Sequence, residues 1–214
     1  MKTIFKYLLM LVVFLSLLIF FSNWIDLQTK SEKKLIHKEE KILFESRLFL
    51  EANRIKEFIV NKNNYNKEIA FLVDMKIESN KYRIFIYNLK EHKIIDKGLV
   101  AHGSGSEDKR KSNGELFFSN EKNSLCTSLG KYEIKNSYSG DFGKSYRLKG
   151  LDKTNSNAMI RNIVLHKYKD VPEKEQFDPI CLSWGCPMVN ENFYKKLEKI
   201  IDNSDKTILL SIYY

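Results

Sequence analysis

Glycine and proline are confined to the later part of this chain of 214 residues. All nine glycines lie between positions 98 and 185, and all three prolines come after position 169. Glycine and proline are the strongest local interruptions of regular structure, so the first 97 residues contain no standard helix breaker. The sequence therefore predicts helices near the N-terminus, and short strands joined by turns further along the chain.

An uncharged apolar run covers residues 7–25. As a helix it would be about 28 Å long at ~1.5 Å per residue, close to the ~30 Å hydrocarbon core of a bilayer. Trp24 stands where an aromatic residue at the membrane interface would stand. We expect residues 1–28 to form a transmembrane signal anchor that is retained.

A cleaved signal peptide is the alternative, with Lys2 and Lys6 as its basic head. Cleavage sites require small residues at the end of the apolar run. Only Ser22 is small there, and no alanine occurs before Ala52. These features favour the anchor, but they leave cleavage open.

Residues 31–60 have a helical pattern, within a spacer that we assign to residues 29–66. Mixed lysines and glutamates cover one face. We expect this helix to pack on the domain that follows, and too few heptads are present to favour a coiled dimer stalk. The apolar positions are Leu35, Ile42, Leu43, Phe49, Leu50, Ala52, Ile55, Phe58 and Ile59.

Residues 67–214 form the third segment, in which short apolar runs alternate with glycine- and asparagine-bearing turns. Many short strands with turn signals predict a mostly β fold, a sandwich or barrel with short helices. Asn190 is placed to cap one of these helices, with Phe193 and Leu197 on its apolar face. The expected strands cover 69–75, 82–87, 93–101, 131–135, 145–151, 162–166 and 207–213.

A cysteine in a glycine-bearing turn carries the clearest chemical signal, Ser183-Trp184-Gly185-Cys186-Pro187. Upstream, the apolar run 162–165 ends at His166. A cysteine nucleophile needs a nearby base, because the thiolate is the reactive form. Gly185 would let the backbone turn tightly and bring N–H groups to a developing oxyanion. The alternative is a small buried cysteine and a histidine without a catalytic role.

From about residue 69 to its end, the chain resembles the murein L,D-transpeptidase catalytic domain family. The resemblance rests on several stretches in the same order, which end with Arg161 to His166 and the Cys186 turn. The earlier stretches are residues 100–106, 118–120, 127–132, 138–143, 148–152 and 154–158.

The resemblance implies that Cys186 is the acylated nucleophile and His166 its base. Its substrate would be the stem tetrapeptide of peptidoglycan, from which D-alanine leaves, and the acyl group would pass to a second stem as a 3→3 cross-link. Water as acceptor would make the same site an L,D-carboxypeptidase. Family members often have a small residue after the histidine, whose carbonyl orients the imidazole. Lys167 stands there, and a carbonyl serves that role with any side chain.

Three further residues are expected to contact substrate, namely His102, Arg161 and Ser183. The alternative for such polar groups is that they satisfy backbone atoms in turns. Among the other polar residues of the matched stretches, we expect Asn120, Ser128 and Asn157 to be structural.

The charge distribution and the spacing of cysteine and histidine indicate which classes of ligand to expect. The formal net charge is +9, but the lysines are scattered among acidic residues and show no pattern typical of nucleic-acid binding. We expect no cofactor and no metal, since cysteine and histidine lack metal-site spacing. If the domain is exported, Cys126 and Cys181 could pair, whereas a Cys181–Cys186 bridge would disable the nucleophile.

The expected location is the outer side of the cytoplasmic membrane, where the substrate of the family lies. Lys30, Lys33, Lys34 and Lys38 follow the apolar run, and the positive-inside rule would place such a flank in the cytoplasm. We expect export, because the catalytic resemblance is more specific than a charge count. A membrane-anchored protein that binds peptidoglycan without catalysis is the alternative function.

Overall fold

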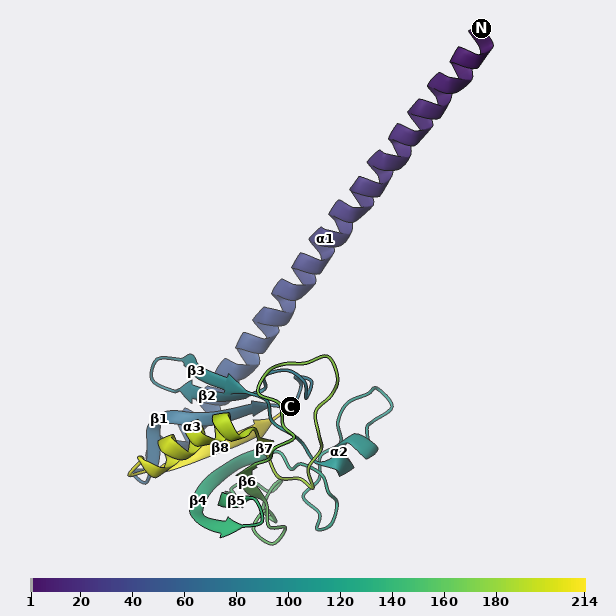
Figure 1. Ribbon diagram of the computed structural model, residues 1–214. Coiled ribbons are helices and arrows are strands. Elements are labelled where there is room, and N and C mark those ends of the chain that lie inside the picture. Colours follow the sequence, from purple (N-terminus) through teal and green to yellow (C-terminus); the bar gives the residue numbers. More distant parts are fainter. Residues whose placement is uncertain (1) are drawn as a thin grey trace. The chain divides into compact units, whose positions relative to one another are not determined.

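The computed structural model describes the backbone of residues 2–214, and the side chains of residues 6, 10 and 20–214. The chain divides into two compact units, Met1–Arg47 and Leu48–Tyr214. Helix α1 (Lys2–Ile59) begins in the first unit and ends in the second (Figure 1). It includes nearly all of the helix predicted over residues 31–60.

The first unit is helical, and its side chains from residue 20 to residue 43 are exposed, Leu35 and Leu43 among them. Among the described residues, no helix combines the length and the apolar character that crossing a membrane requires. Most side chains of the expected membrane span, residues 7–25, lie outside the described residues. The transmembrane anchor therefore stays a prediction from the sequence.

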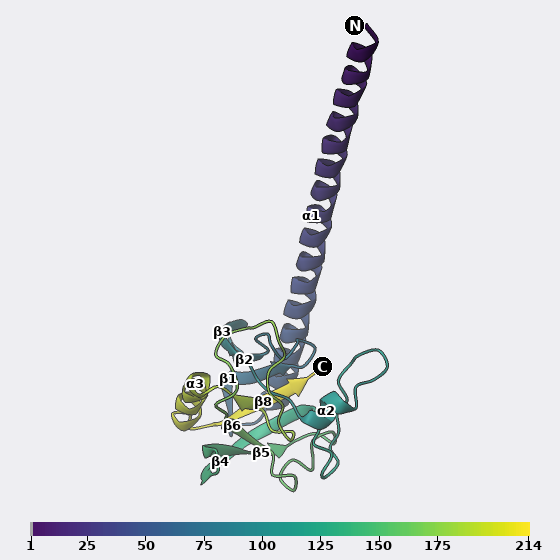
Figure 2. The same cartoon turned by 45° about the vertical axis from the view of Figure 1, so that its right-hand side comes forward.

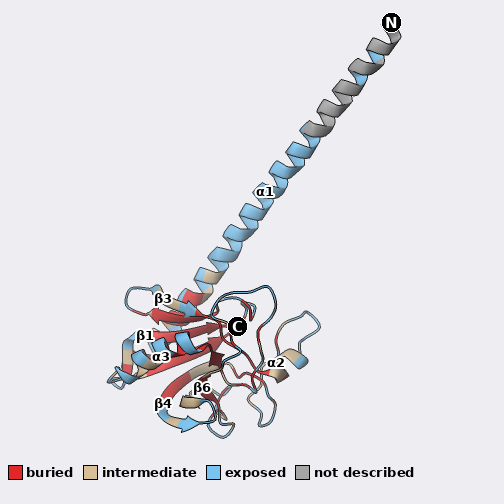
Figure 3. Cartoon of the chain, in the orientation of Figure 1, coloured by how far each residue is buried: buried red, intermediate tan, exposed pale blue. Residues whose placement is uncertain are grey.

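The last turns of α1 belong to the second unit and carry a buried stripe. Leu48, Ala52, Ile55 and Ile59 are buried and lie three or four residues apart, which places them on one helical face (Figure 3). Beside them the buried Glu51 carboxylate accepts a hydrogen bond of 2.6 Å from the Ser211 hydroxyl. This end of α1 is thus part of the packed domain.

Eight strands form one mixed sheet in the order β3-β2-β1-β8-β4-β5-β6-β7. Two neighbouring pairs, β1–β8 and β6–β7, are parallel, and the other pairs are antiparallel. The strands are β1 (Tyr65–Asp74), β2 (Ile84–Asn88), β3 (Lys93–Gly98), β4 (Gly130–Gly140), β5 (Gly143–Gly150), β6 (Val164–Lys167), β7 (Met188–Val189) and β8 (Thr207–Tyr213).

The expectation of a mostly β domain with short helices is confirmed, but the sheet arrangement is more specific than a generic sandwich or barrel. A single mixed sheet is present, and its end strand β7 is bridged at Met188 to Ala101, just beyond β3. The core cluster draws on most strands, including Phe71 of β1, Tyr132 of β4 and Leu210 of β8. Figure 3 shows the later half of β1 as buried, whereas β4 is buried only in its first half, around Tyr132.

Two short helices complete the domain, α2 (Ser104–Asp108) and α3 (Glu191–Asp202) (Figure 2). Asn190 caps α3 as predicted, since its side-chain oxygen accepts a 2.8 Å hydrogen bond from the Phe193 N–H. Phe193, Tyr194 and Leu197 on its buried face join the main core. The sequence did not predict α2 or the two-residue strand β7.

The buried stripe of α1 yields a matched pair of variants. Ile55→Ala should lower the free energy of unfolding by about 2–5 kcal/mol, because it leaves a cavity in the core. Leu50→Ala, on the exposed face of the same turns, should change it by less than about 0.5 kcal/mol. Urea unfolding of both variants measures the difference, and equal effects would contradict the packing of this helix end.

Candidate active site

The segment of residues 183–188 is held by main-chain hydrogen bonds on two sides. On one side β7 pairs with β6, so that His166 lies opposite Met188, and the His166 N–H donates to the Pro187 carbonyl at 3.4 Å. On the other side Ser183 donates to the His102 carbonyl at 2.8 Å and accepts from the Ser104 N–H at 2.7 Å. The register of β6 and β7 thus brings His166 beside the residues that follow Cys186.

Cys186 and His166 line the same cavity, of about 340 Å³. Ser183 and Trp184 line it as well, and Trp184 is 79% exposed. Phe142, in the turn between β4 and β5, stacks on the His166 ring with centroids 4.1 Å apart. The other lining residues are Tyr168, Leu182 and Met188.

The His166 imidazole has a defined tautomer. Its Nδ1 lies 3.0 Å from the Lys167 carbonyl oxygen, and because a carbonyl can only accept, Nδ1 carries the proton. Nε2 of the neutral ring therefore keeps a lone pair that can accept a proton. Burial lowers the pKa of His166, which keeps the imidazole neutral near pH 7.

The carbonyl of Lys167 thus takes the orienting position expected from the sequence, despite the long side chain of this residue. That side chain reaches α3 instead, where its ammonium donates to the Glu191 carboxylate at 3.2 Å. The basic group is therefore bound on the surface.

The Cys186 thiol is packed among apolar groups and rests in its protonated form. Burial raises its pKa above the ordinary value of 9.0, an effect that the Val164 N–H and the Arg161 charge partly offset. The Val164 N–H lies 3.4 Å from Sγ, and the thiol donates to the Asn162 carbonyl at 3.8 Å. Asn162 adopts a left-handed conformation with φ 54°, which aims this carbonyl at the thiol.

Gly185 is required by the shape of the turn before the thiol. Its φ is +109°, and a Cβ at this position would lie 2.6 Å from the Cys126 carbonyl oxygen. Its N–H donates to the Ser183 hydroxyl at 3.1 Å. The Ser183 hydroxyl therefore stabilises the turn, and Ser183 also lines the cavity.

Arg161 lies behind the turn and does not line the cavity of Cys186. Its guanidinium donates to the carbonyls of Ser119 at 2.9 Å and Cys126 at 2.5 Å, and to the Ser128 hydroxyl at 3.2 Å. These contacts fix the loop against which Gly185 packs. Contact of Arg161 with substrate stays a prediction.

His102 lies in a second cavity, with its ring hydrogen-bonded to Arg83 at 2.9 Å and to Glu107 at 2.9 Å. The structure therefore groups Cys186, His166 and Ser183 around one cavity, with Gly185 in the turn beneath it, and places His102 and Arg161 elsewhere.

Sequence reasoning assigned no role to two residues that contact the reactive pair, Phe142 and Asn162. Phe142 belongs to a stretch that carries the family resemblance, whereas the backbone contact of Asn162 leaves no signal in residue type.

The three cysteines are free, so neither of the bridges considered from the sequence forms in this structure. Cys126 is buried and donates to the Ser124 carbonyl at 3.3 Å. Within the described part of the chain, no three histidine, cysteine or acidic side chains are grouped so that they could hold a metal ion.

Comparison with protein families decides the relationship of the chain. A family model described as the L,D-transpeptidase catalytic domain matches residues 42–213. The chain belongs to this family. The match begins within α1, before the compact unit of Leu48–Tyr214. A search of the curated proteins returned no match.

Solved structures similar to this member of the family have low sequence identity. The L,D-transpeptidase of Xylanimonas cellulosilytica is 11% identical with a TM-score of 0.37, and the match covers 69% of this chain and 61% of that one. The L,D-transpeptidase of Stackebrandtia nassauensis is 13% identical with a TM-score of 0.41, and the match covers 71% of this chain and 58% of that one. The helical cell shape determining protein Pgp2 of Campylobacter jejuni is 12% identical with a TM-score of 0.40, and the match covers 78% of this chain and 54% of that one. The chain thus spans less than two thirds of each of these structures.

The turn at Gly185 can be tested against a matched glycine. Gly185→Ala should lower the free energy of unfolding by about 2 kcal/mol or more. The strain of a positive φ in alanine and the clash of its Cβ with the Cys126 carbonyl oxygen both contribute to this loss. Gly114→Ala should cost only about 1 kcal/mol, since Gly114 also has a positive φ but open space around it. Urea unfolding compares the two, and a smaller loss for Gly185→Ala would contradict the close approach to Cys126.

The protonation state of Cys186 predicts how the rate of its alkylation depends on pH. Because burial raises the pKa of Cys186, its alkylation by iodoacetamide should still accelerate between about pH 8 and pH 10. The rate is measured by mass spectrometry on the peptide that contains Cys186, with the Cys126 and Cys181 peptides as internal references. A rate that levels off below about pH 7 would instead indicate a resting thiolate paired with an imidazolium.

Proposed function

We propose that this protein is a cysteine acyltransferase that acts on peptidoglycan stem peptides as an L,D-transpeptidase. The observation that carries the proposal is the shared cavity of Cys186 and His166, in which the imidazole is held with its Nε2 lone pair available. Membership of the L,D-transpeptidase catalytic domain family supplies the class of substrate.

In the first step, the proton of the Cys186 thiol passes to Nε2 of His166 as sulfur attacks the carbonyl of the diamino acid at the third position of the stem. The C–S bond forms, and the carbonyl oxygen becomes an oxyanion that backbone N–H groups of the turn would stabilise. His166 then returns the proton to the departing amine, the C–N bond breaks and D-alanine leaves. A thioester remains on Cys186.

In the second step, an amine of another stem peptide attacks the thioester and restores the thiol, which gives a 3→3 cross-link. With water as the acceptor, the product is a trimmed stem and the same site acts as a carboxypeptidase. Neutral resting forms of both residues suit this cycle, since His166 must accept the thiol proton before it can donate one.

We further propose that the domain works outside the cytoplasmic membrane, where such stems are found. The apolar run of residues 7–25 supports export as a retained anchor or as a signal.

Digestion of purified muropeptides by the full chain tests the proposal, with products read by mass spectrometry. Cys186→Ala should abolish both D-alanine release and cross-linked dimers, and His166→Ala should slow them by about 10²–10⁴-fold. Cys181→Ala is the matched control and should keep activity, because Cys181 lies outside the lining of the Cys186 cavity.

Unchanged turnover in Cys186→Ala would refute the nucleophile. Retention of wild-type protein on wall sacculi, with no mass change in the peptides, would indicate a protein that binds peptidoglycan without catalysis.

A further inference from the structure

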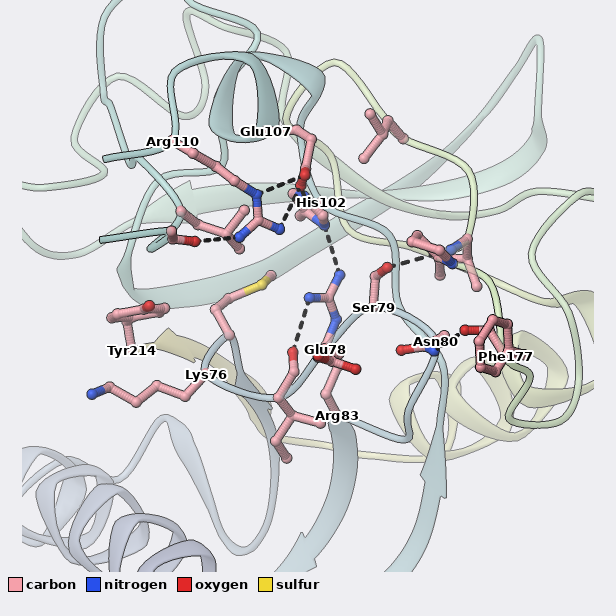
Figure 4. A pocket seen from close by; sticks show the side chains of 17 residues that line it. Lys76, Glu78, Ser79, Asn80, Arg83, His102, Glu107, Arg110, Phe177 and Tyr214 are labelled. Carbon is pink, nitrogen blue, oxygen red and sulfur yellow. Dashed lines mark hydrogen bonds and ion pairs between the residues drawn. The ribbon is translucent and has the colours of Figure 1, made fainter. Parts of the chain in front are cut away.

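A second cavity, of about 520 Å³, lies beside the cavity of Cys186, and Leu182 lines both. Its walls come from residues 75–80 after β1, from Arg83, from the region of α2 and from the loop that ends at Leu182. Figure 4 shows the side chains of Arg83, His102, Glu107 and Arg110 in a chain of hydrogen bonds along one wall. We call this cavity the Arg83 pocket.

Arg83 is 1% exposed, and its hydrogen bonds end on uncharged acceptors. Its Nε and Nη2 donate to the Val100 carbonyl at 2.9 and 2.7 Å, Nη1 donates to the Ile77 carbonyl at 3.2 Å, and Nη2 also donates to His102 Nδ1 at 2.9 Å. These bonds occupy four of the five N–H groups of a guanidinium, so one on Nη1 remains. A buried charge whose hydrogen bonds all go to neutral groups is costly, and the charges of Glu107 and Asp74 offset part of that cost through space.

Glu107, the nearest acidic residue in this chain of hydrogen bonds, already has partners. Because arginine can only donate, His102 accepts at Nδ1, and its Nε2–H donates to Glu107. Arg110 binds the same carboxylate through two nitrogens, at 2.6 and 2.9 Å. A neutral imidazole thus separates Arg83 from Glu107, since burial lowers the pKa of His102 to about 4. Burial likewise lowers the pKa of Arg83 to about 9, and the charges of Glu107 and Asp74 act in the opposite direction.

The rest of the lining favours a small monoanion with an apolar body. Lys76 and Arg110 add positive charge, and Glu78 and Glu107 add negative charge. Leu116 and Ile180 supply apolar surface. A phosphate with two negative charges would meet repulsion from Glu78 and Glu107, whereas one carboxylate needs only Arg83 and Arg110. The volume lies in the range of pockets that hold small molecules.

We propose that the Arg83 pocket binds the carboxylate of a short peptide or an amino acid, with Arg83 and Arg110 as the groups that recognise it. The pocket neighbours the Cys186 cavity, since Leu182 lines both and the Ser183 N–H donates to the His102 carbonyl. The carboxylate can come from a wall peptide that extends from the cleft, which rests on the proposed function, or from a free amino acid.

The binding test uses the full chain with Cys186→Ala, so that no turnover interferes. N-acetyl-D-alanine and its neutral amide are titrated, and NMR shifts are followed for the Arg83 side chain, for the amides of residues 77–83 and 102–107, and for those of 183–188. The carboxylate should saturate the Arg83 signals, and the amide should bind about tenfold more weakly or worse.

Arg83 lies in the core, so the test variant is Arg110→Gln on the rim, with Lys81→Gln as the matched surface control outside the pocket. Arg110→Gln should weaken binding of the carboxylate about fivefold or more, and Lys81→Gln should leave it unchanged. Equal binding of acid and amide, shifts confined to residues 183–188, or no saturable shift at Arg83 would overturn the proposal.

Kinetics with muropeptides then distinguish the two sources of the carboxylate. If Arg110→Gln, made in the chain with Cys186 intact, raises KM and keeps kcat, the ligand is part of the wall substrate. If KM is unchanged while probe binding is weakened, the ligand is a free amino acid. The titration does not depend on turnover, so failure of the proposed acyl transfer and failure of this pocket are separate results.

Discussion

The site depends on the main-chain hydrogen bonds that hold residues 183–188 between β6 and the segment around His102. Parallel pairing of β7 with β6 sets His166 opposite Met188, and the bonds of Ser183 fix the other end of the segment. Between these anchors the chain must pass through Gly185 at φ +109°, against the Cys126 carbonyl. A thiol in a loop held on both sides retains its position relative to the imidazole without a direct bond between them.

The same packing sets the protonation of the pair. Cys186 contacts both core clusters of the domain, and its burial raises its thiol pKa, while burial lowers the pKa of His166. Both groups are therefore neutral at rest, and the Lys167 carbonyl fixes which imidazole nitrogen can take the proton. In the proposed acyl transfer, the proton of the thiol would therefore move to the imidazole as sulfur attacks the substrate, instead of before it in a preformed ion pair.

The structure brings together the predicted residues around the thiol, whereas the predicted substrate contacts His102 and Arg161 lie apart from the Cys186 cavity and stay predictions. Cys186 and Gly185 follow from a local motif, because a thiol in a glycine-bearing turn is set by a short stretch of chain, and the orienting carbonyl after His166 was implied by the family resemblance. His102 and Arg161 lie in the same matched stretches, yet the fold directs one into the Arg83 pocket and the other behind the Gly185 turn. Side-chain direction at those positions depends on neighbours that are distant in sequence, such as Arg83 for His102 and Ser119 for Arg161.

The sequence alone determined the helical start of the chain, the positions of most strands, the cap of α3 at Asn190 and the family, because each depends on local pattern or motif. Only the tertiary structure decided that β8 enters the sheet between β1 and β4, that the last turns of α1 pack through Ile55, and that His166 meets the Cys186 turn. These features pair segments that lie far apart along the chain. The free energy that selects them comes from burial and hydrogen bonds across the whole domain, which no local window of sequence contains.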